Sequence, residues 1–133
     1  MPMSFSSDVK AELAEYIAEA RHCLFAELSA MLSMSARVRK RKEGYEIQVN
    51  KGSVTGRFGR TFCEVANELL NHNLVSVIAS DAHGTMARTC EMRDAYKVLA
   101  RAYDERYLNI LFDENPRRIC SNLETVRMPI KSF

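Results

Sequence analysis

The sequence lacks the features that would place a protein in a membrane or outside the cell. No apolar run among its 133 residues approaches the length of a membrane-spanning helix. The first ten residues lack the basic-then-apolar layout of a signal peptide. We therefore expect a cytoplasmic protein.

A strong charge of either sign is also missing. The net charge of +2 is too small by itself to indicate a nucleic-acid or membrane partner. With 47% hydrophobic and 27% charged residues, the composition is that of a folded protein. The length suits one domain with a modest core, or two small pieces.

The motifs of several hydrolase and metal-binding classes are absent. The four cysteines contain no Cys-x-x-Cys pair, so we expect free thiols rather than a zinc cage. None has an arginine at the offset of the Cys-x5-Arg loop that cysteine-dependent phosphatases need. The Gly-x-Ser-x-Gly motif of serine hydrolases does not occur either.

Helical periodicity is present at the N-terminal end. Apolar residues recur at helical spacing in two stretches, which predicts two amphipathic helices. The first stretch contains Val9, Leu13, Tyr16, Ile17 and Ala20, and the second contains Leu24, Phe25, Leu28, Met31 and Leu32.

The apolar period then changes to two, which predicts a β-hairpin. Residues 36–41 and 45–50 form its strands, Glu43-Gly44 separates them, and the second strand is expected to have one wet face. The hairpin is basic, and we favour a solvated edge strand over a phosphate-contacting patch. Its basic residues are Arg37, Arg39, Lys40, Arg41 and Lys42.

A β-α-β unit follows the hairpin. Residues 45–50 and 74–79 read as strands and 60–71 as a helix that an Asn at 71–73 closes, and such units nearly always have parallel, right-handed strands. The intervening loop, residues 51–59, contains three of the five glycines and could bind phosphate through backbone N–H groups.

The second strand leads into Asp81 and His83, two residues apart. An extended backbone would point both side chains the same way, and an oxygen with a nitrogen makes half of a divalent metal site. The alternative is that Asp81 caps the next helix or closes an Asx turn. Because parallel strands end at one edge, Arg57 should lie close to this pair. Arg57 and Arg88 could together bind an anionic substrate.

Helical spacing continues through the last third of the chain. Residues 92–103 and 107–112 are expected to be helical. Asp113-Glu114-Asn115-Pro116 predicts a stop and a restart, with Asn115 as the N-cap of a short helix that holds Ile119 and Leu123. The residues from Val126 onward read as a tail.

Four motifs in order resemble the C-terminal part of the CpsB/YwqE-type tyrosine phosphatases, in the PHP (polymerase and histidinol phosphatase) superfamily. They are residues 49–59 (VNKGSVTGRFG), 74–83 (LVSVIASDAH), Arg88 with 92–96 (MRDAY), and 111–116 (LFDENP). The resemblance implies a distorted β/α barrel and a manganese cluster that hydrolyses phosphotyrosine on polysaccharide-export kinases. It also implies that Asp81 and His83 are metal ligands and that Arg88 contacts the phosphate.

Other parts of the sequence depart from that family. Its N-terminal His-x-His metal motif is missing. Residues 3–13 (MSFSSDVKAEL) and 26–32 (AELSAML) instead resemble the start of the WhiA sporulation regulators, which bind DNA. These resemblances divide the chain into residues 1–44, WhiA-like, and 45–133, phosphatase-like, as a gene fusion would.

The expected fold class is α/β, with two N-terminal helices and a β-hairpin followed by a β-α-β-α fragment of a PHP-type barrel. Because a catalytic metal normally needs three or more protein ligands, we expect weak binding of Mn²⁺ or another divalent ion and little or no turnover. A DNA-binding protein that uses the basic hairpin and a nonfunctional truncation are the alternatives. Exposed strand edges predict self-association.

Overall fold

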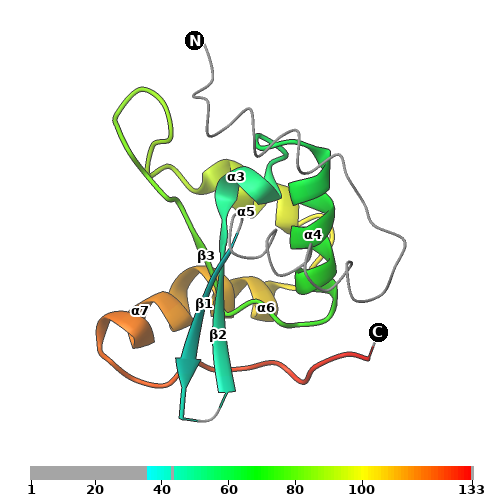
Figure 1. The fold of residues 1–133 in the computed structure, drawn as a ribbon, viewed down its shortest axis with the longest axis vertical. Helices are drawn as coiled ribbons and strands as arrows, with labels where there is room; N and C mark the ends of the chain where they lie inside the picture. The colour runs from blue at the N-terminus through cyan, green and yellow to red at the C-terminus, as the bar shows by residue number, and fades with distance from the viewer. Residues whose placement is uncertain (1–35, 43, 133) are drawn as a thin grey trace.

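A computed structural model describes residues 36–42 and 44–132 (Figure 1). The two helices predicted before residue 36 lie outside the described residues. The described part is a mixed α/β fold, as expected, with three strands and a set of helices packed against them.

The sheet has the order β1-β2-β3. Strand β1 (Ala36–Arg41) pairs antiparallel with β2 (Gly44–Asn50), which confirms the hairpin. Strand β2 pairs parallel with β3 (Val77–Ala79), which confirms parallel strands in the β-α-β unit. The strand predicted over 74–79 is shorter than expected because the side-chain hydroxyl of Ser76, in place of a backbone group, accepts the N–H of Ile47 at 3.1 Å.

The wet face predicted for β2 is wrong near the hairpin turn. Tyr45 is 58% exposed, whereas Glu46 is buried at 6% exposure. The reason is that Arg41 covers Glu46, with 3.3 Å between the two charged groups, and also reaches Glu124 at 3.6 Å. Toward the other end of β2, Val49 is buried and Ile47 packs against the hydrophobic core.

Two helices flank the loop that precedes α4. The glycine-containing segment predicted as a loop begins with a helical turn, α3 (Lys51–Val54), so that expectation holds only for its second half. Helix α4 (Arg60–Asn71) has the predicted bounds. Asn73 follows it with φ 58°, the left-handed conformation that asparagine tolerates at a helix end.

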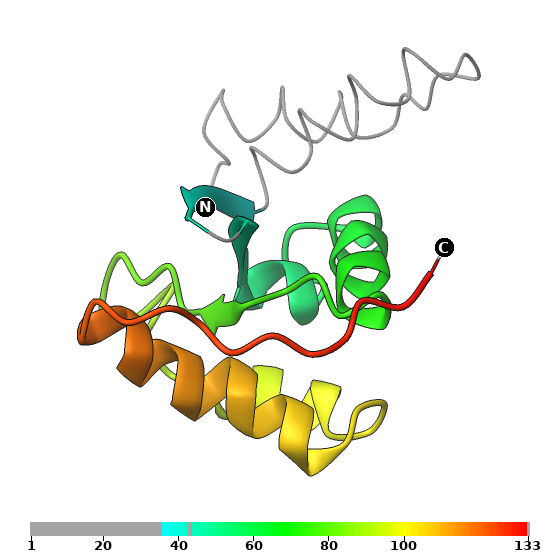
Figure 2. The same cartoon turned by 90° about the horizontal axis from the view of Figure 1, so that it is seen from below.

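The remaining helices differ from the sequence prediction. Helix α5 (Arg93–Leu99) ends four residues early, in a turn where the N–H of Tyr103 donates to Leu99 O at 2.9 Å. Helix α6 (Glu105–Asn109), the π-helical turn η1 (Ile110–Glu114) and α7 (Asn115–Cys120) follow one another without a break (Figure 2). The predicted stop at 113–116 is therefore wrong, because the chain absorbs it in a π turn. Leu123, expected within α7, lies beyond it.

Asn115 is not an N-cap, and its amide is completely buried. Its Nδ2 donates to Ser76 O at 2.7 Å and Val126 O at 3.0 Å, while its Oδ1 accepts the N–H of Val126 at 2.7 Å. The segment predicted as a tail is thus attached to the fold. Further along, Asn73 donates to Pro129 O at 2.8 Å.

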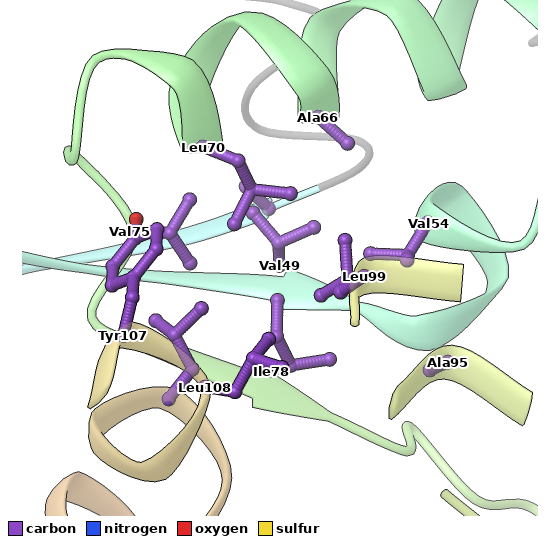
Figure 3. Close-up of a cluster of buried hydrophobic side chains, with 12 residues drawn as sticks. Val49, Val54, Ala66, Leu70, Val75, Ile78, Ala95, Leu99, Tyr107 and Leu108 are labelled. Carbon is purple, nitrogen blue, oxygen red and sulfur yellow. The ribbon is translucent and has the colours of Figure 1, made fainter. Parts of the chain in front are cut away.

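The core lies on both sides of β2 and β3. Figure 3 shows Ala66 and Leu70 of α4 on one side of β2, and Tyr107 and Leu108 of α6 on the other. Burial of these apolar side chains is the main stabilising contribution to the packing. Within residues 36–42 and 44–132, no helix is long and apolar enough to cross a membrane.

Candidate functional site at the carboxyl edge of the parallel strands

The carboxyl ends of β2 and β3 bring polar side chains together, as expected of parallel strands. Asn50 is the last residue of β2, and Asp81 comes two residues after β3. The Asn50 side-chain amide donates to Asp81 Oδ2 at 3.4 Å and accepts a hydrogen bond from Gln48 at 3.2 Å. The amide therefore connects the two strand ends.

The Asp81 carboxylate is paired with Arg88. Arg88 Nη2 lies 2.5 Å from Asp81 Oδ2, and the two side chains are 40% and 21% exposed. Such a charge-assisted contact is shorter and stronger than a neutral hydrogen bond. The pairing shows that Arg88 reaches the group that the sequence placed at the centre of the site.

The backbone at this edge is not extended, contrary to expectation. Asp81 has φ 48° and Arg88 has φ 50°, both in the left-handed region. Aspartate is one of the few residues that adopt this conformation readily, because its short side chain bonds locally. The spacing argument that pointed Asp81 and His83 the same way therefore fails at Asp81.

His83 is exposed and closes the loop that follows β3. Its backbone N–H donates to Arg88 O at 2.9 Å, and its ring Nδ1 lies 2.7 Å from the carbonyl oxygen of Asp81. A carbonyl oxygen can only accept, so Nδ1 carries the proton. Nε2 of the neutral ring then keeps a lone pair, the arrangement that metal-binding histidines use.

The loop of residues 80–92 is also bound by Lys51, which directly follows β2. The Lys51 ammonium, at the start of α3, donates to the carbonyl oxygens of Thr89 and, at 2.7 Å, Glu91. The Glu91 carboxylate accepts the N–H of Arg93, the first residue of α5, at 2.7 Å, and this bond lowers the pKa of Glu91. Glu91, rather than Asp81, therefore accepts a backbone hydrogen bond at the start of α5.

The two candidate arginines have different surroundings. The guanidinium carbon of Arg88 lies 5.9 Å from the centre of the Phe58 ring. Arg57 is exposed in the loop between α3 and α4, and among the described residues it forms no ion pair with Asp81. The structure therefore brings Arg88, but not Arg57, into contact with the predicted metal ligand.

Sequence reasoning missed three residues of this edge: Asn50, Lys51 and Phe58. Asn50 could have been found from the sequence, because it is the polar residue at the end of the strand that runs parallel to the one before Asp81. Lys51 and Phe58 lie in the 49–59 motif, but their contacts with residues 88–91 depend on tertiary structure that no local pattern encodes.

The described residues do not complete a metal centre by themselves. Within residues 36–42 and 44–132, no group of three or more His, Cys, Asp or Glu side chains could hold an ion. The Asp81 carboxylate, moreover, is shared with Arg88. Asp81 and His83 have suitable donor chemistry, yet they amount to two ligands where three or more are normally needed.

The basic residues of the hairpin run from Arg37, which pairs with Gln48 near this edge, to Lys42 in the hairpin turn. Arg37, Arg39, Lys40 and Lys42 are exposed, while Arg41 is half-buried in its contacts with Glu46 and Glu124. Among the described strands β1 lies at the edge of the sheet, which agrees with the solvated edge that the sequence favoured.

Together the fold and the site define an α/β protein whose parallel strands present a carboxylate, an imidazole and a guanidinium at one edge. Residues 16–121 match the family described as capsular polysaccharide synthesis, CpsB/CapC. The chain belongs to this family. The match begins within the segment predicted to be WhiA-like.

Several curated relatives are tyrosine-protein phosphatases. The chain is 28% identical over 88 residues to YwqE of Bacillus subtilis, a match that covers 66% of this chain and 34% of the relative. It is 39% identical over 54 residues to CpsB of Streptococcus pneumoniae, covering 41% of this chain and 22% of the relative. The matched part thus spans about a third of YwqE and less of CpsB.

A solved structure has the same fold. It comes from a study of YwqE from Bacillus subtilis and CpsB from Streptococcus pneumoniae, described as unique metal-dependent tyrosine phosphatases. The TM-score is 0.63 at 21% identity, and the alignment covers all of this chain and 54% of that one. This likeness shows that the present chain shares the fold of about half of that structure.

Proposed function

We propose that this chain takes part in metal-dependent hydrolysis of phosphotyrosine on a protein of capsule or polysaccharide synthesis, in the cytoplasm. Its relatives are named as tyrosine phosphatases, and a solved structure of the same fold is named as metal-dependent. The observation that carries the proposal is the cluster of Asp81, His83 and Arg88 at one strand edge.

Each residue of the cluster has a role suited to its chemistry. Asp81 offers an oxygen and His83 a nitrogen to a divalent ion, with Mn²⁺ as the expected metal. Arg88 presents a planar guanidinium that matches the geometry of a phosphate group and balances its charge. Arg57 stays a candidate for a more distant contact with the substrate.

Turnover by the 133-residue chain alone should be weak or absent. The described residues contain no third donor near Asp81 and His83, so the ion would be loosely held. In this proposal the phosphatase-like part is residues 45–133, and its activity is impaired because the described residues supply two ligands and no third.

Manganese binding and peptide hydrolysis test the proposal together. We expect calorimetry to detect weak Mn²⁺ binding that Asp81→Ala and His83→Ala abolish, with any hydrolysis of a phosphotyrosine peptide lost in the same variants. His72→Ala, at the end of α4, is the matched control and should behave as wild type. Hydrolysis that survives both substitutions would contradict the proposed ligands. Tight, stoichiometric manganese would contradict the incomplete centre.

A second candidate is DNA binding without catalysis, in line with the WhiA resemblance of residues 1–44. The exposure of Arg37, Arg39, Lys40 and Lys42 favours it, since such side chains can contact the phosphates of a nucleic acid. Replacing all four by glutamine should abolish retention of duplex DNA and flatten its salt dependence. Equal retention of wild type and variant would exclude this function for the hairpin.

A further inference from the structure

The loop between α3 and α4 folds back so that Phe58 lies against Gly52. The backbone N–H of Phe58 donates to Gly52 O at 3.3 Å. Gly56 and Gly59, with φ of 78° and 104°, provide the turns on either side that a residue with a side chain would resist.

The phenylalanine ring fits only because residue 52 has no side chain. A Cβ placed on Gly52 would lie 2.5 Å from Cε2 and 2.6 Å from Cζ of the ring, far inside van der Waals contact. Gly52 is itself buried in α3 and has no need of a left-handed conformation. The glycine is therefore explained by the space it leaves for Phe58, not by its backbone.

The same ring also meets Arg88. The guanidinium carbon lies 5.9 Å from the ring centre, within the range of a cation–π contact. The same guanidinium is bound to Asp81 at 2.5 Å. Two contacts thus orient a side chain that is 40% exposed and would otherwise sample many rotamers.

We propose that Phe58, seated in the space left by Gly52, is a positioning residue that orients the Arg88 guanidinium for binding a phosphoryl group. The inference rests on the proposed function for its phosphate contact, while the orientation of Arg88 is a separate, measurable property. When a phosphate replaces Asp81 as the partner of Arg88, the ring contact remains and keeps the guanidinium from swinging into solvent. The conformational entropy of the Arg88 side chain is then already lost in the free protein, so binding of the substrate does not have to offset it.

Nuclear magnetic resonance of the arginine side chains tests the orientation directly. In the wild-type chain the Arg88 side-chain protons should show a ring-current shift caused by Phe58. Phe58→Leu should abolish that shift, Phe58→Tyr should keep it, and Gly52→Ala should displace the ring and change the shift as strongly as Phe58→Leu. Phe112→Leu is the matched control, because that half-buried ring packs against Tyr96 on another part of the fold. An Arg88 signal that Phe58→Leu leaves unchanged would overturn the proposal.

Binding of O-phosphotyrosine in the presence of MnCl₂ tests the consequence. We expect Phe58→Leu and Gly52→Ala each to weaken binding by about two- to fivefold, the scale of a partly exposed cation–π contact, and Phe58→Tyr to restore it. The double variant should be no weaker than Phe58→Leu alone, because both changes remove the same contact. Unchanged affinity in Phe58→Leu would overturn the positioning role. A wild-type chain that binds no phosphotyrosine but loses the ring-current shift in Phe58→Leu would overturn the proposed function and support the orientation.

Discussion

At the carboxyl edge, the charges of Asp81 and Arg88 are balanced by each other. Arg88 and the Asn50 amide both contact the Oδ2 atom of Asp81. Under the proposed function, a divalent ion bound at Oδ2 would compete with Arg88 for this oxygen. Such binding would release Arg88 for an anionic group.

This competition predicts the effect of removing the arginine charge. Arg88→Gln should bind Mn²⁺ about two- to fivefold more tightly than wild type, because an exposed ion pair contributes up to about 1 kcal/mol. Arg88→Lys, which keeps a positive charge near Asp81, is the control and should bind close to wild type. The measurement is calorimetry at low ionic strength. Weaker binding by Arg88→Gln would mean that the arginine supports the ion instead of opposing it.

Asn115 shows how one residue can fix a distant segment. Asn115→Ala removes three hydrogen bonds and leaves the buried carbonyl of Ser76 and the half-buried backbone groups of Val126 without these partners, so it should destabilise the fold by about 2–4 kcal/mol. Urea unfolding measures the change in the free energy of unfolding. Asn109→Ala, at an exposed position of α6, should change it by less than about 0.5 kcal/mol. Similar losses for both variants would contradict the role of the buried amide.

At the scale of whole elements, local patterns predicted much of what the structure contains. The hairpin, α4 and its left-handed Asn73, and the parallel pairing of β2 with β3 follow from periodicity and turn chemistry. The failures have a common physical cause. Glu46 is buried by Arg41 across the hairpin turn, Asp81 is paired with Arg88 across the following loop, and Asn115 contacts Ser76 from 39 positions away. These are tertiary contacts, which helical or strand periodicity does not encode.

The loop between α3 and α4 depends on its glycines for backbone shape. Gly59 has φ 104° and ψ 168°, a region that is essentially restricted to glycine, and nothing lies near the position of a Cβ. Gly59→Ala should therefore cost about 1–3 kcal/mol from backbone strain alone. Gly84→Ala is the control, since Gly84 lacks a positive φ and its nearest neighbour would be 3.5 Å away. Thermal unfolding that shifts equally in both variants would argue against strain at Gly59.

Considered as a whole, the described part of the molecule has two distinct surfaces. One is the carboxyl edge, where the structure pairs Asp81 with Arg88, two residues that the family resemblance had singled out, while the ring of Phe58 was not foreseen. The other is the free edge of β1, where basic side chains alternate with an exposed Val38. The sequence could identify both surfaces because one lies along a predicted strand and the other lies at the ends of two predicted strands. It could not give their contacts, because these depend on how the loops fold back, as when Arg88 meets both Asp81 and the distant Phe58.

The β1 edge determines how copies of the chain should associate. Its backbone groups can pair with a second β1, and Val38 and Tyr45, 50% and 58% exposed, offer apolar contact on one face. Arg37, Arg39 and Lys40 oppose this by repulsion that salt screens over about 10 Å at 0.1 M. Light scattering should therefore show the mass rising from 15.2 kDa toward twice that value as salt increases. Val38→Lys should keep the chain monomeric, whereas Ile130→Lys, exposed on the C-terminal segment, should not. A monomer at every salt concentration would show that the charged side chains and strand twist already protect this edge.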